Sequence, residues 1–392
     1  MFASAAIPPE PGILSVSAFA RLLTRIREAG YTLVGPTVRE GAIVLDTLEG
    51  VDDLPIGWQE TQDAGQYRLH RLETPTYFGF SQGPHAWKKY LHPPRLKLFS
   101  AKKTPQGFEI TSSRPPVTRY AFLGPRACDL HAMEKQAAVF ASATQPDPTY
   151  AQTLEQALVV AVSCTRSGGT CFCTSMNTGP SVEGLARSSE RRAGYDLALT
   201  EYLAVDRHFF WVELGSERGR ALVEGLTSPG TQEMELQAKT QVVEAARTQT
   251  RHLHTEGLRE ALRAEANSPR WQEIAQRCLS CGSCTLVCPT CFCHSVEDTS
   301  DVTGEHAERW RRWDSCFTQD FSYIHGGGVR QEGASRYRQW LTHKLSTWFD
   351  QFGSSGCVGC GRCIAWCPVG IDITQEAEGF RLASLARPTS AV

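Results

Sequence analysis

Two cysteine runs with the same spacing constrain this chain more than any other feature. Each run has the form C-x2-C-x2-C-x3-C-P, and the runs span residues 278–289 and 357–368. Three thiolates from one tight loop can occupy three corners of a four-iron cubane, while the fourth, on the helix that follows, points away. The runs therefore predict two [4Fe-4S] clusters. Their ligands would be Cys278, Cys281, Cys284, Cys288, Cys357, Cys360, Cys363 and Cys367.

The last cysteine of each run predicts that the two runs exchange a ligand. In bacterial-type ferredoxins with this spacing, that cysteine binds the cluster of the other run. Cys367 would then complete the cluster of the first run, and Cys288 would complete the cluster of the second. Structural zinc is the alternative for cysteine quartets, but it usually takes two C-x2-C pairs. Two complete four-cysteine runs favour iron–sulfur clusters.

Composition places the chain in a broad class. It has 392 residues, 15 cysteines and a formal net charge of −2, so the total charge does not indicate a nucleic-acid partner or a membrane surface. No apolar run is long enough to span a membrane. The first 16 residues lack the basic region and apolar core of a signal peptide. We therefore expect a cytoplasmic protein, in which so many cysteines are metal ligands rather than disulfides.

The first part of the chain alternates helical and strand-like patterns. Residues 17–29 are predicted to form a helix, and 129–141 and 219–226 two more. Strands are predicted at 31–38, 42–48, 67–73, 117–124 and 157–163, with two further apolar runs in 195–213. Strands 117–124 and 157–163, with a helix between them, have the pattern of a βαβ unit. Residues 75–100 are expected to be a long surface loop, with Lys88 and Lys89 on a solvated face.

From about residue 233 the composition becomes helical. Helices are expected across 233–277. Helices at 270–278, 338–351 and 373–384 would flank the cysteine runs. Seven basic residues lie in the 68-residue spacer between the runs. Near the clusters their charge would favour the reduced form, or they could form an ordinary charged helix surface. They are Arg309, Arg311, Arg312, Arg330, Arg336, Arg338 and Lys344.

These patterns predict an α+β protein of two domains. Residues 1–230 would form a mixed α/β docking domain, and residues 231–392 an α-helical ferredoxin domain with two [4Fe-4S] clusters. The boundary is expected at Ser228-Pro229-Gly230.

Four further cysteines form a candidate third site. Cys128 and Cys164 each follow a predicted strand, and if those strands are parallel neighbours the two thiols emerge at the same edge of the sheet. Cys171 and Cys173 follow as a C-x-C pair. The four could hold a third iron–sulfur cluster, or they could be ordinary small buried residues. The sequence leaves both alternatives open.

Three cysteines remain, and several motifs are absent. Cys291, Cys293 and Cys316, with His294, form a weaker ligand set, for which packing near the clusters is the simpler interpretation. Gly326-Gly327-Gly328 is predicted to be a turn. The chain has no G-x-G-x-x-G after a strand and no phosphate-binding loop. It therefore has predicted electron carriers without a visible hydride-handling cofactor, which is typical of a non-catalytic subunit that relays electrons.

Several phrases of the sequence resemble one family. They include Cys288-Pro-Thr-Cys-Phe-Cys, Trp313-Asp-Ser-Cys316, the stretch 336–344 and the second cysteine run. Gly124-Pro-Arg-Ala-Cys128-Asp-Leu-His131, Cys171-Phe-Cys173-Thr-Ser-Met and 196–201 contribute as well. From about residue 75 onward the chain resembles the iron–sulfur β subunit of cytosolic bidirectional NiFe hydrogenases of the sulfhydrogenase type. The corresponding iron–sulfur protein of anaerobic sulfite reductase is similar.

The resemblance implies an electron-transfer subunit of a larger oxidoreductase complex. A flavin subunit with FAD would oxidise NAD(P)H and pass single electrons to this chain. The chain would pass them to the small subunit of a NiFe hydrogenase, whose large subunit holds the NiFe site. In the alternative complex, a sirohaem subunit of a sulfite reductase would be the acceptor. The resemblance carries over the eight run cysteines as ligands and leaves the third site undecided.

Overall fold

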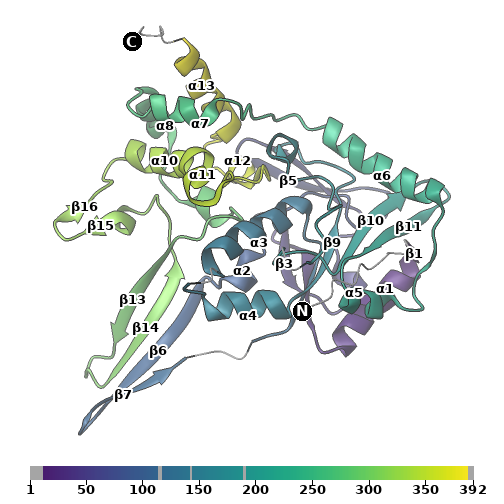
Figure 1. Cartoon of the computed structure of the whole chain (residues 1–392), viewed down its shortest axis with the longest axis horizontal. Coiled ribbons are helices and arrows are strands. Elements are labelled where there is room, and N and C mark those ends of the chain that lie inside the picture. The colour runs from purple at the N-terminus through teal and green to yellow at the C-terminus, as the bar shows by residue number, and fades with distance from the viewer. Residues whose placement is uncertain (1–11, 114–116, 142–143, 189–190, 387–392) are drawn as a thin grey trace.

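An eight-stranded sheet forms the centre of the N-terminal half in this computed structural model (Figure 1). The structure describes residues 12–113, 117–141, 144–188 and 191–386, so the first 11 residues, where no signal peptide is predicted, lie outside it. The strand order is β12-β1-β11-β10-β9-β8-β2-β3. The strands are β1 (Gly12–Ser15), β2 (Thr32–Arg39), β3 (Ala42–Thr47), β8 (Tyr120–Leu123), β9 (Leu158–Val162), β10 (Leu197–Leu203), β11 (His208–Leu214) and β12 (Ser228–Pro229).

The middle of this sheet is parallel. β8 pairs in parallel with both β2 and β9, and β9 pairs in parallel with β10. The prediction that the strands after which Cys128 and Cys164 lie are parallel neighbours is thus confirmed. All five residues of β9 are buried, because helices cover both faces of a parallel sheet. The carboxyl ends of β8 and β9 meet at one edge, which is where such sheets build sites.

Helices pack on both faces of the sheet. On one face, Phe19, Leu22 and Ile26 of α1 (Val16–Glu28) join a core with α5 (Glu217–Val223). On the other face, α3 (Ala127–Phe140) and α4 (Pro148–Gln156) form a second core with Phe122 and Val159. The helices expected at 17–29, 129–141 and 219–226 are confirmed, whereas α4 was not predicted from the sequence.

The expectation of a surface loop at 75–100 is wrong. Phe78, Phe80 and Trp87 are buried, a short helix α2 covers Lys88–Leu91, and a long strand β6 begins at Arg95. The Lys88 side chain is buried as well, and its Nζ donates hydrogen bonds to backbone carbonyl oxygens of the first cysteine run and its flank. The segment therefore lies between the sheet and the C-terminal half of the chain.

A four-stranded antiparallel sheet projects from the body of the molecule (Figure 1). Its order is β13-β14-β6-β7, so two strands of the spacer pair with two strands of the N-terminal half. The strands are β6 (Arg95–Thr104), β7 (Gly107–Ser112), β13 (His294–Ser300) and β14 (His306–Trp313). Arg309, Arg311 and Arg312 lie on β14 and not on a helix, which corrects the expected helical spacer. The division near residue 230 stays a prediction.

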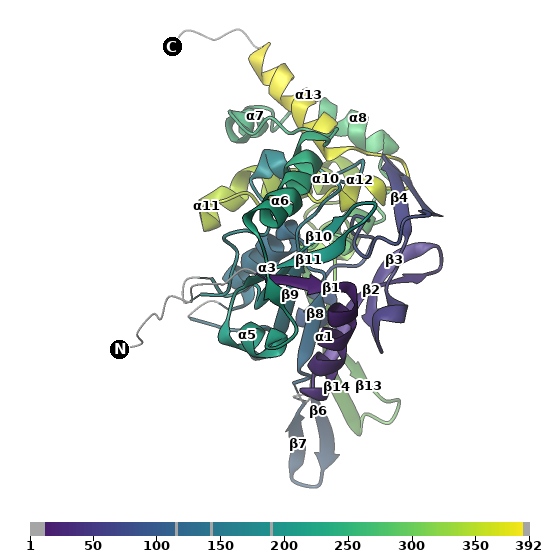
Figure 2. The same cartoon turned by 90° about the vertical axis from the view of Figure 1, so that its right-hand side faces the viewer.

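The C-terminal part is mainly helical around a separate core. Helices α7, α8 and α13 lie together at the end of the molecule away from the projecting sheet (Figure 2). Trp271 stacks on Phe380 with ring centroids 3.9 Å apart. The helices are α6 (Gln232–Arg247), α7 (Leu258–Ala264), α8 (Arg270–Arg277), α9 (Ser283–Leu286), α10 (Gly333–Thr342), α11 (Trp348–Phe352), α12 (Arg362–Ala365) and α13 (Ile373–Leu385). The predicted helices at 270–278, 338–351 and 373–384 are confirmed.

Two small hairpins complete the fold. β4 (Trp58–Asp63) pairs with β5 (Gln66–Arg71), and β15 (Tyr323–Ile324) pairs with β16 (Gly327–Gly328), so the glycine run lies at a turn as predicted. The strand expected at 67–73 is confirmed. Among the described helices, none has the length and apolar character that crossing a membrane requires.

Candidate metal centres

The two cysteine runs adopt the same local structure. In each run the second cysteine is followed by a glycine in the left-handed region, Gly282 with φ 75° and Gly361 with φ 73°. Each glycine begins a four-residue helix, α9 in the first run and α12 in the second, and these helices contact each other. The third cysteine lies within this short helix and the fourth lies beyond it. The repeated turn places three thiols of each run around the same kind of concave loop.

The first three cysteines of the first run share a cavity with the last two cysteines of the second. The cavity is lined by Cys278, Cys281, Cys284, Cys363 and Cys367. Aromatic and aliphatic side chains close it: Leu279, Phe317, Tyr337, Trp340 and Ile371. Burial raises the pKa of Cys284 well above its ordinary value, and the neighbouring thiolates of Cys278, Cys367 and Cys281 act in the same direction. Cysteines of both runs therefore line one apolar cavity.

Cys288 of the first run lies with the remaining three cysteines of the second. Its Sγ is 3.1 Å from Thr290 Oγ1, which in turn donates to Gly356 O, next to Cys357. Burial raises the pKa of Cys363 well above its ordinary value, and the thiolates of Cys357, Cys360 and Cys288 add to this effect. Cys288 thus lies among cysteines of the second run, which agrees with the exchange of a ligand between the runs, and the two crossed sets stay a prediction.

Backbone amides and one buried cation face these sulfurs. The amide N–H groups of Ser280, Gly359 and Ile371 donate to Sγ atoms of the runs at 3.3–3.4 Å. The fully enclosed Lys344 Nζ lies 3.3 Å from Cys288 Sγ and 3.6 Å from Cys291 Sγ. Donors and cations around thiolates suit the net negative charge of a four-thiolate cluster. The donor environment therefore fits the predicted [4Fe-4S] groups.

The described side chains do not form a compact site for a single metal ion. Within the described ranges, no three His, Cys, Asp or Glu side chains converge closely enough to hold one metal ion. A cubane fills the space between its ligands, so its thiolates stand farther apart than those bound to one zinc at about 2.3 Å.

Lys344 also changes the protonation of its neighbours. A hydrogen bond with Cys291, together with the Lys344 charge, holds the pKa of Cys288 well below its ordinary value. Burial opposes the charge of Lys344 itself, yet the thiolates of Cys288, Cys291 and Cys357 raise its pKa. Ligand thiols must lose their protons to bind iron, and the pair Lys344–Cys288 favours that loss at the ligand that crosses between the runs.

The three surplus cysteines lie beside the run cysteines. Cys291 contacts Cys288 and Lys344, and the side chains of Cys293 and Cys316 are hydrogen-bonded to each other. The ring of His294 instead packs against His92 and Phe140, and its Nδ1 lies 3.2 Å from Phe292 O. The structure therefore places these thiols near the candidate centres and directs the His294 ring to other partners.

Two buried basic residues belong to the site although the sequence analysis did not place them there. Lys88 Nζ donates to Thr285 O at 3.0 Å and to Cys291 O at 3.2 Å. Arg362, inside the second run, is 1% exposed and pairs with Asp129 of α3 at 2.8 Å. The position of Arg362 between Gly361 and Cys363 is the one sequence feature that could have placed it at the site. The sequence around Lys88 contains no such feature.

Comparison with known proteins identifies the class of site. Residues 277–371 match the family model described as a 4Fe-4S dicluster domain, and these residues contain both cysteine runs. The chain is thus an iron–sulfur protein in its C-terminal part. Over 367 residues it is 28% identical to Sulfhydrogenase 2 subunit beta of Pyrococcus furiosus, which covers 93% of this chain and 96% of that protein. No solved structure matches the chain.

These findings confirm the resemblance to hydrogenase-type iron–sulfur β subunits. The similarity extends through the N-terminal sheet as well as the dicluster domain. The domain and the similarity together support a role in iron–sulfur electron transfer.

Proposed function

We propose that this chain is the electron-transfer subunit of a cytoplasmic oxidoreductase complex. It relays single electrons through two [4Fe-4S] clusters, from a flavin subunit that oxidises NAD(P)H to the small subunit of a NiFe hydrogenase. The clusters supply one-electron redox chemistry when bound. One cluster takes Cys278, Cys281, Cys284 and Cys367, and the other takes Cys357, Cys360, Cys363 and Cys288.

The cavity that cysteines of both runs line together is the observation that carries this proposal. The cavity lined by both Cys278 and Cys367 supports exchange of a ligand between the runs. If the runs exchange their fourth ligands, the two clusters lie close together, because α9 and α12 are in contact. The chain's own residues exclude water with aromatic side chains such as Trp340 and provide the amide donors and the Lys344 charge. These features suit residues that carry electrons and do not transform a substrate.

The partners are proposed from the similar protein. Its name, Sulfhydrogenase 2 subunit beta, implies that other subunits accompany it. For this chain, the flavin subunit would bind FAD and NAD(P), whereas the hydrogenase large subunit would hold the NiFe site. The same relay in an anaerobic sulfite reductase is the alternative, in which the acceptor would be a sirohaem subunit.

Co-purification of the native complex tests the proposal. A tag on this chain, with anaerobic purification from its own cells, is expected to recover a flavoprotein and the two NiFe hydrogenase subunits. Addition of NAD(P)H to that complex should reduce the clusters, as followed by low-temperature EPR. A sirohaem protein among the recovered subunits would favour the alternative. NADH- or hydrogen-dependent dye reduction by the purified chain alone would contradict the relay function.

Ligand variants test the crossed sets in the same complex. Cys367→Ser and Cys281→Ser are expected to alter the same EPR signal, because both residues belong to the first cluster. Cys288→Ser should alter the other signal. If Cys367→Ser changed the signal that Cys360→Ser changes, each run would hold its own fourth ligand.

A further inference from the structure

Four cysteines outside the two runs gather where strands β8 and β9 end. Cys128 lies in the first turn of α3, which follows β8, and Cys164 lies two residues beyond β9. Because β8 and β9 are adjacent and parallel, both residues lie at the same edge of the sheet. Cys171 and Cys173 lie on the loop that leaves this edge.

Close packing places Cys173 beside the start of α3. A Cβ atom built on Gly179 would lie 3.2 Å from Cys173 Sγ and 3.2 Å from Ala127 Cβ, so these two atoms flank the same glycine. The amide of Cys164 donates to Pro180 O at 3.2 Å, which folds the loop back over the end of β9. Cys173, Cys164 and Ala127, which precedes Cys128, thus pack around the turn at Gly179-Pro180.

The four thiols are shielded from solvent. Cys128, Cys164 and Cys171 are half-buried, and Cys173 is buried. Limited solvent exposure is typical of the thiolate ligands of iron–sulfur clusters and helps to set their potential.

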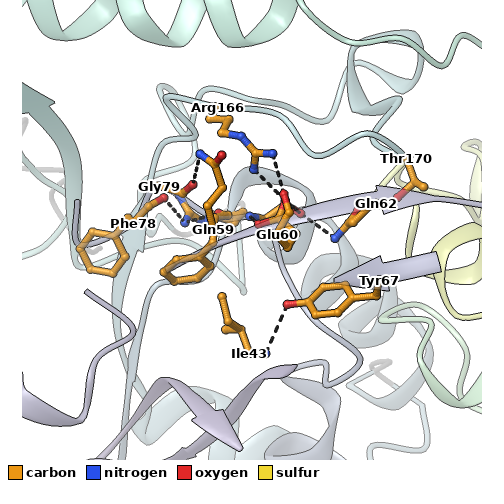
Figure 3. A network of polar contacts seen from close by, with 12 residues as sticks. Ile43, Gln59, Glu60, Gln62, Tyr67, Phe78, Gly79, Arg166 and Thr170 are labelled. Carbon is orange, nitrogen blue, oxygen red and sulfur yellow. Dashed lines mark hydrogen bonds and ion pairs between the residues drawn. The ribbon is translucent and has the colours of Figure 1, made fainter. Parts of the chain in front are cut away.

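A polar network fixes the loop that carries Cys164 and Cys171 (Figure 3). Arg166 of the loop binds Glu60 of β4, with 2.7 Å between Nη1 and Oε1, and the Glu60 side chain has no exposed surface. Thr170 Oγ1 donates to Gln62 Oε1 of the same strand at 2.8 Å. A buried, fully paired carboxylate holds its partners in one arrangement, so the loop is preorganised rather than free to collapse.

Buried donors lie beside the thiols. Gln249 Nε2 donates to Cys173 Sγ at 3.1 Å. Arg362 Nη1 and Arg126 Nε are buried and have no hydrogen-bond partner among the described residues. Both arginine side chains are at most 2% exposed. Unsatisfied buried cationic donors beside thiols indicate an anionic group between them.

We propose that Cys128, Cys164, Cys171 and Cys173 bind a third [4Fe-4S] cluster. Three thiols from one segment and a fourth from a distant element repeat the donor set of the crossed clusters. The cationic donors Arg362 and Arg126 compensate the net negative charge of four thiolates and the cluster.

The site adjoins the second cysteine run, which makes it a station of the relay. Phe172 N donates to Gly359 O at 2.8 Å, and Thr178 Oγ1 donates to Val358 O at 2.7 Å. One electron that leaves the Cys360 cluster oxidises that cluster by one unit and reduces the third cluster by one unit. This electron-transfer role rests on the proposed function, in which the electron comes from the flavin subunit, whereas the binding of the cluster does not.

Iron and acid-labile sulfide per chain test the site, measured on full-length protein purified anaerobically. The expected value is about twelve irons per chain, three times the four of one cubane. The double variant Cys171→Ala/Cys173→Ala should retain about eight, with the EPR signals of the two run clusters unchanged. Ser181→Ala is the control, since Ser181 is exposed on the same loop and holds no metal in the proposal, and it should retain the full count.

The results of these measurements distinguish failure of the third cluster from failure of the proposed relay function. About eight irons in the unaltered chain, with or without one zinc, would overturn the third cluster and leave the relay standing. Equal iron loss in the Ser181→Ala control would overturn the assignment of these four ligands. A full count in a complex that NAD(P)H does not reduce would contradict the proposed function while retaining the third site.

Discussion

Arg362 and Asp129 form a buried ion pair that joins the second cysteine run to helix α3. Their Nη2 and Oδ1 atoms are 2.8 Å apart, and each side chain is 1% exposed. Asp129 also accepts a hydrogen bond from the Arg126 amide at the start of α3, and Arg362 Nε donates to Gly83 O. The pair thus links the helical part of the chain to α3, which packs on the sheet.

Removing one partner of this pair should strongly destabilise the protein. Arg362→Gln leaves Asp129 as an uncompensated buried charge, which costs about 3–5 kcal/mol. The double variant Arg362→Gln/Asp129→Asn should lose less than the sum of the two single variants. Thermal unfolding midpoints of anaerobic protein measure this. Arg309→Gln is the control, because its pair with Asp298 is exposed and should leave the midpoint unchanged. Additive losses would show that the two residues do not interact.

The two equivalent glycines of the runs should respond differently to alanine. Gly361 and Gly282 have nearly the same φ, so the backbone strain of a Cβ, about 1–2 kcal/mol, is common to both. A Cβ on Gly361 would lie 2.1 Å from Thr170 O, whereas on Gly282 its nearest neighbour is Ser315 Oγ at 3.1 Å. We therefore expect Gly361→Ala to lower the unfolding midpoint and the iron content more than Gly282→Ala. Equal effects of the two substitutions would show that the loop at Thr170 moves aside without a measurable loss of stability.

Local patterns were sufficient to predict the runs and the central strands. Ligand spacing predicted the two cysteine sets, and the nearly all apolar segments at 117–124 and 157–163 indicated strands covered on both faces. The placement of Cys128 and Cys164 followed from those strands. These features depend on neighbours in the sequence, which is why they are legible without the structure.

Features that depend on distant partners were not predictable. Lys88 is buried because Thr285, 197 residues away, accepts its hydrogen bond. The arginines of β14 resemble a solvated helix surface, but β14 pairs with β6, and Arg95 of β6 lies over the Trp310 ring at 4.0 Å. At Lys88 and on β14, contacts with residues distant in the sequence determine the structure, and the local composition does not.

Acid should destabilise the fold through His92. Burial, with Arg311, His294 and Lys88 nearby, lowers the pKa of His92 to about 3, and neither ring nitrogen has a hydrogen-bond partner among the described residues. The folded pKa lies below the unfolded value of about 6.5, so the unfolded state binds more protons between these values. This contribution is complete above about pH 6.5 and is lost as the pH falls, by about 2 kcal/mol at pH 5.

His92→Phe should remove this part of the pH dependence. The ring lies 4.6 Å from Phe140 and stacks on Trp313, so phenylalanine suits the site. The difference in unfolding midpoint between pH 7 and pH 5 should be smaller in His92→Phe than in the unaltered chain. His306→Phe, at an exposed position on β14, should leave that difference unchanged. An unaltered difference in His92→Phe would assign the acid sensitivity to other groups.

Lys344 should set the reduction potential of the cluster that Cys288 joins. Its enclosed ammonium lies 3.3 Å from Cys288 Sγ and also donates to Thr290 Oγ1 at 3.1 Å. A nearby positive charge stabilises the reduced form, which carries one more negative charge, and the effect is large where water is excluded. Lys344→Met should therefore lower the midpoint potential of that cluster by on the order of 60 mV, which is tenfold in a one-electron equilibrium. An EPR-monitored redox titration measures the shift, with Lys239→Met as the control, since Lys239 lies at the surface of α6 and pairs with Glu183 and Glu235. Equal potentials in Lys344→Met and the unaltered chain would reduce Lys344 to a packing role, and a shift confined to the other cluster would contradict the placement of Cys288.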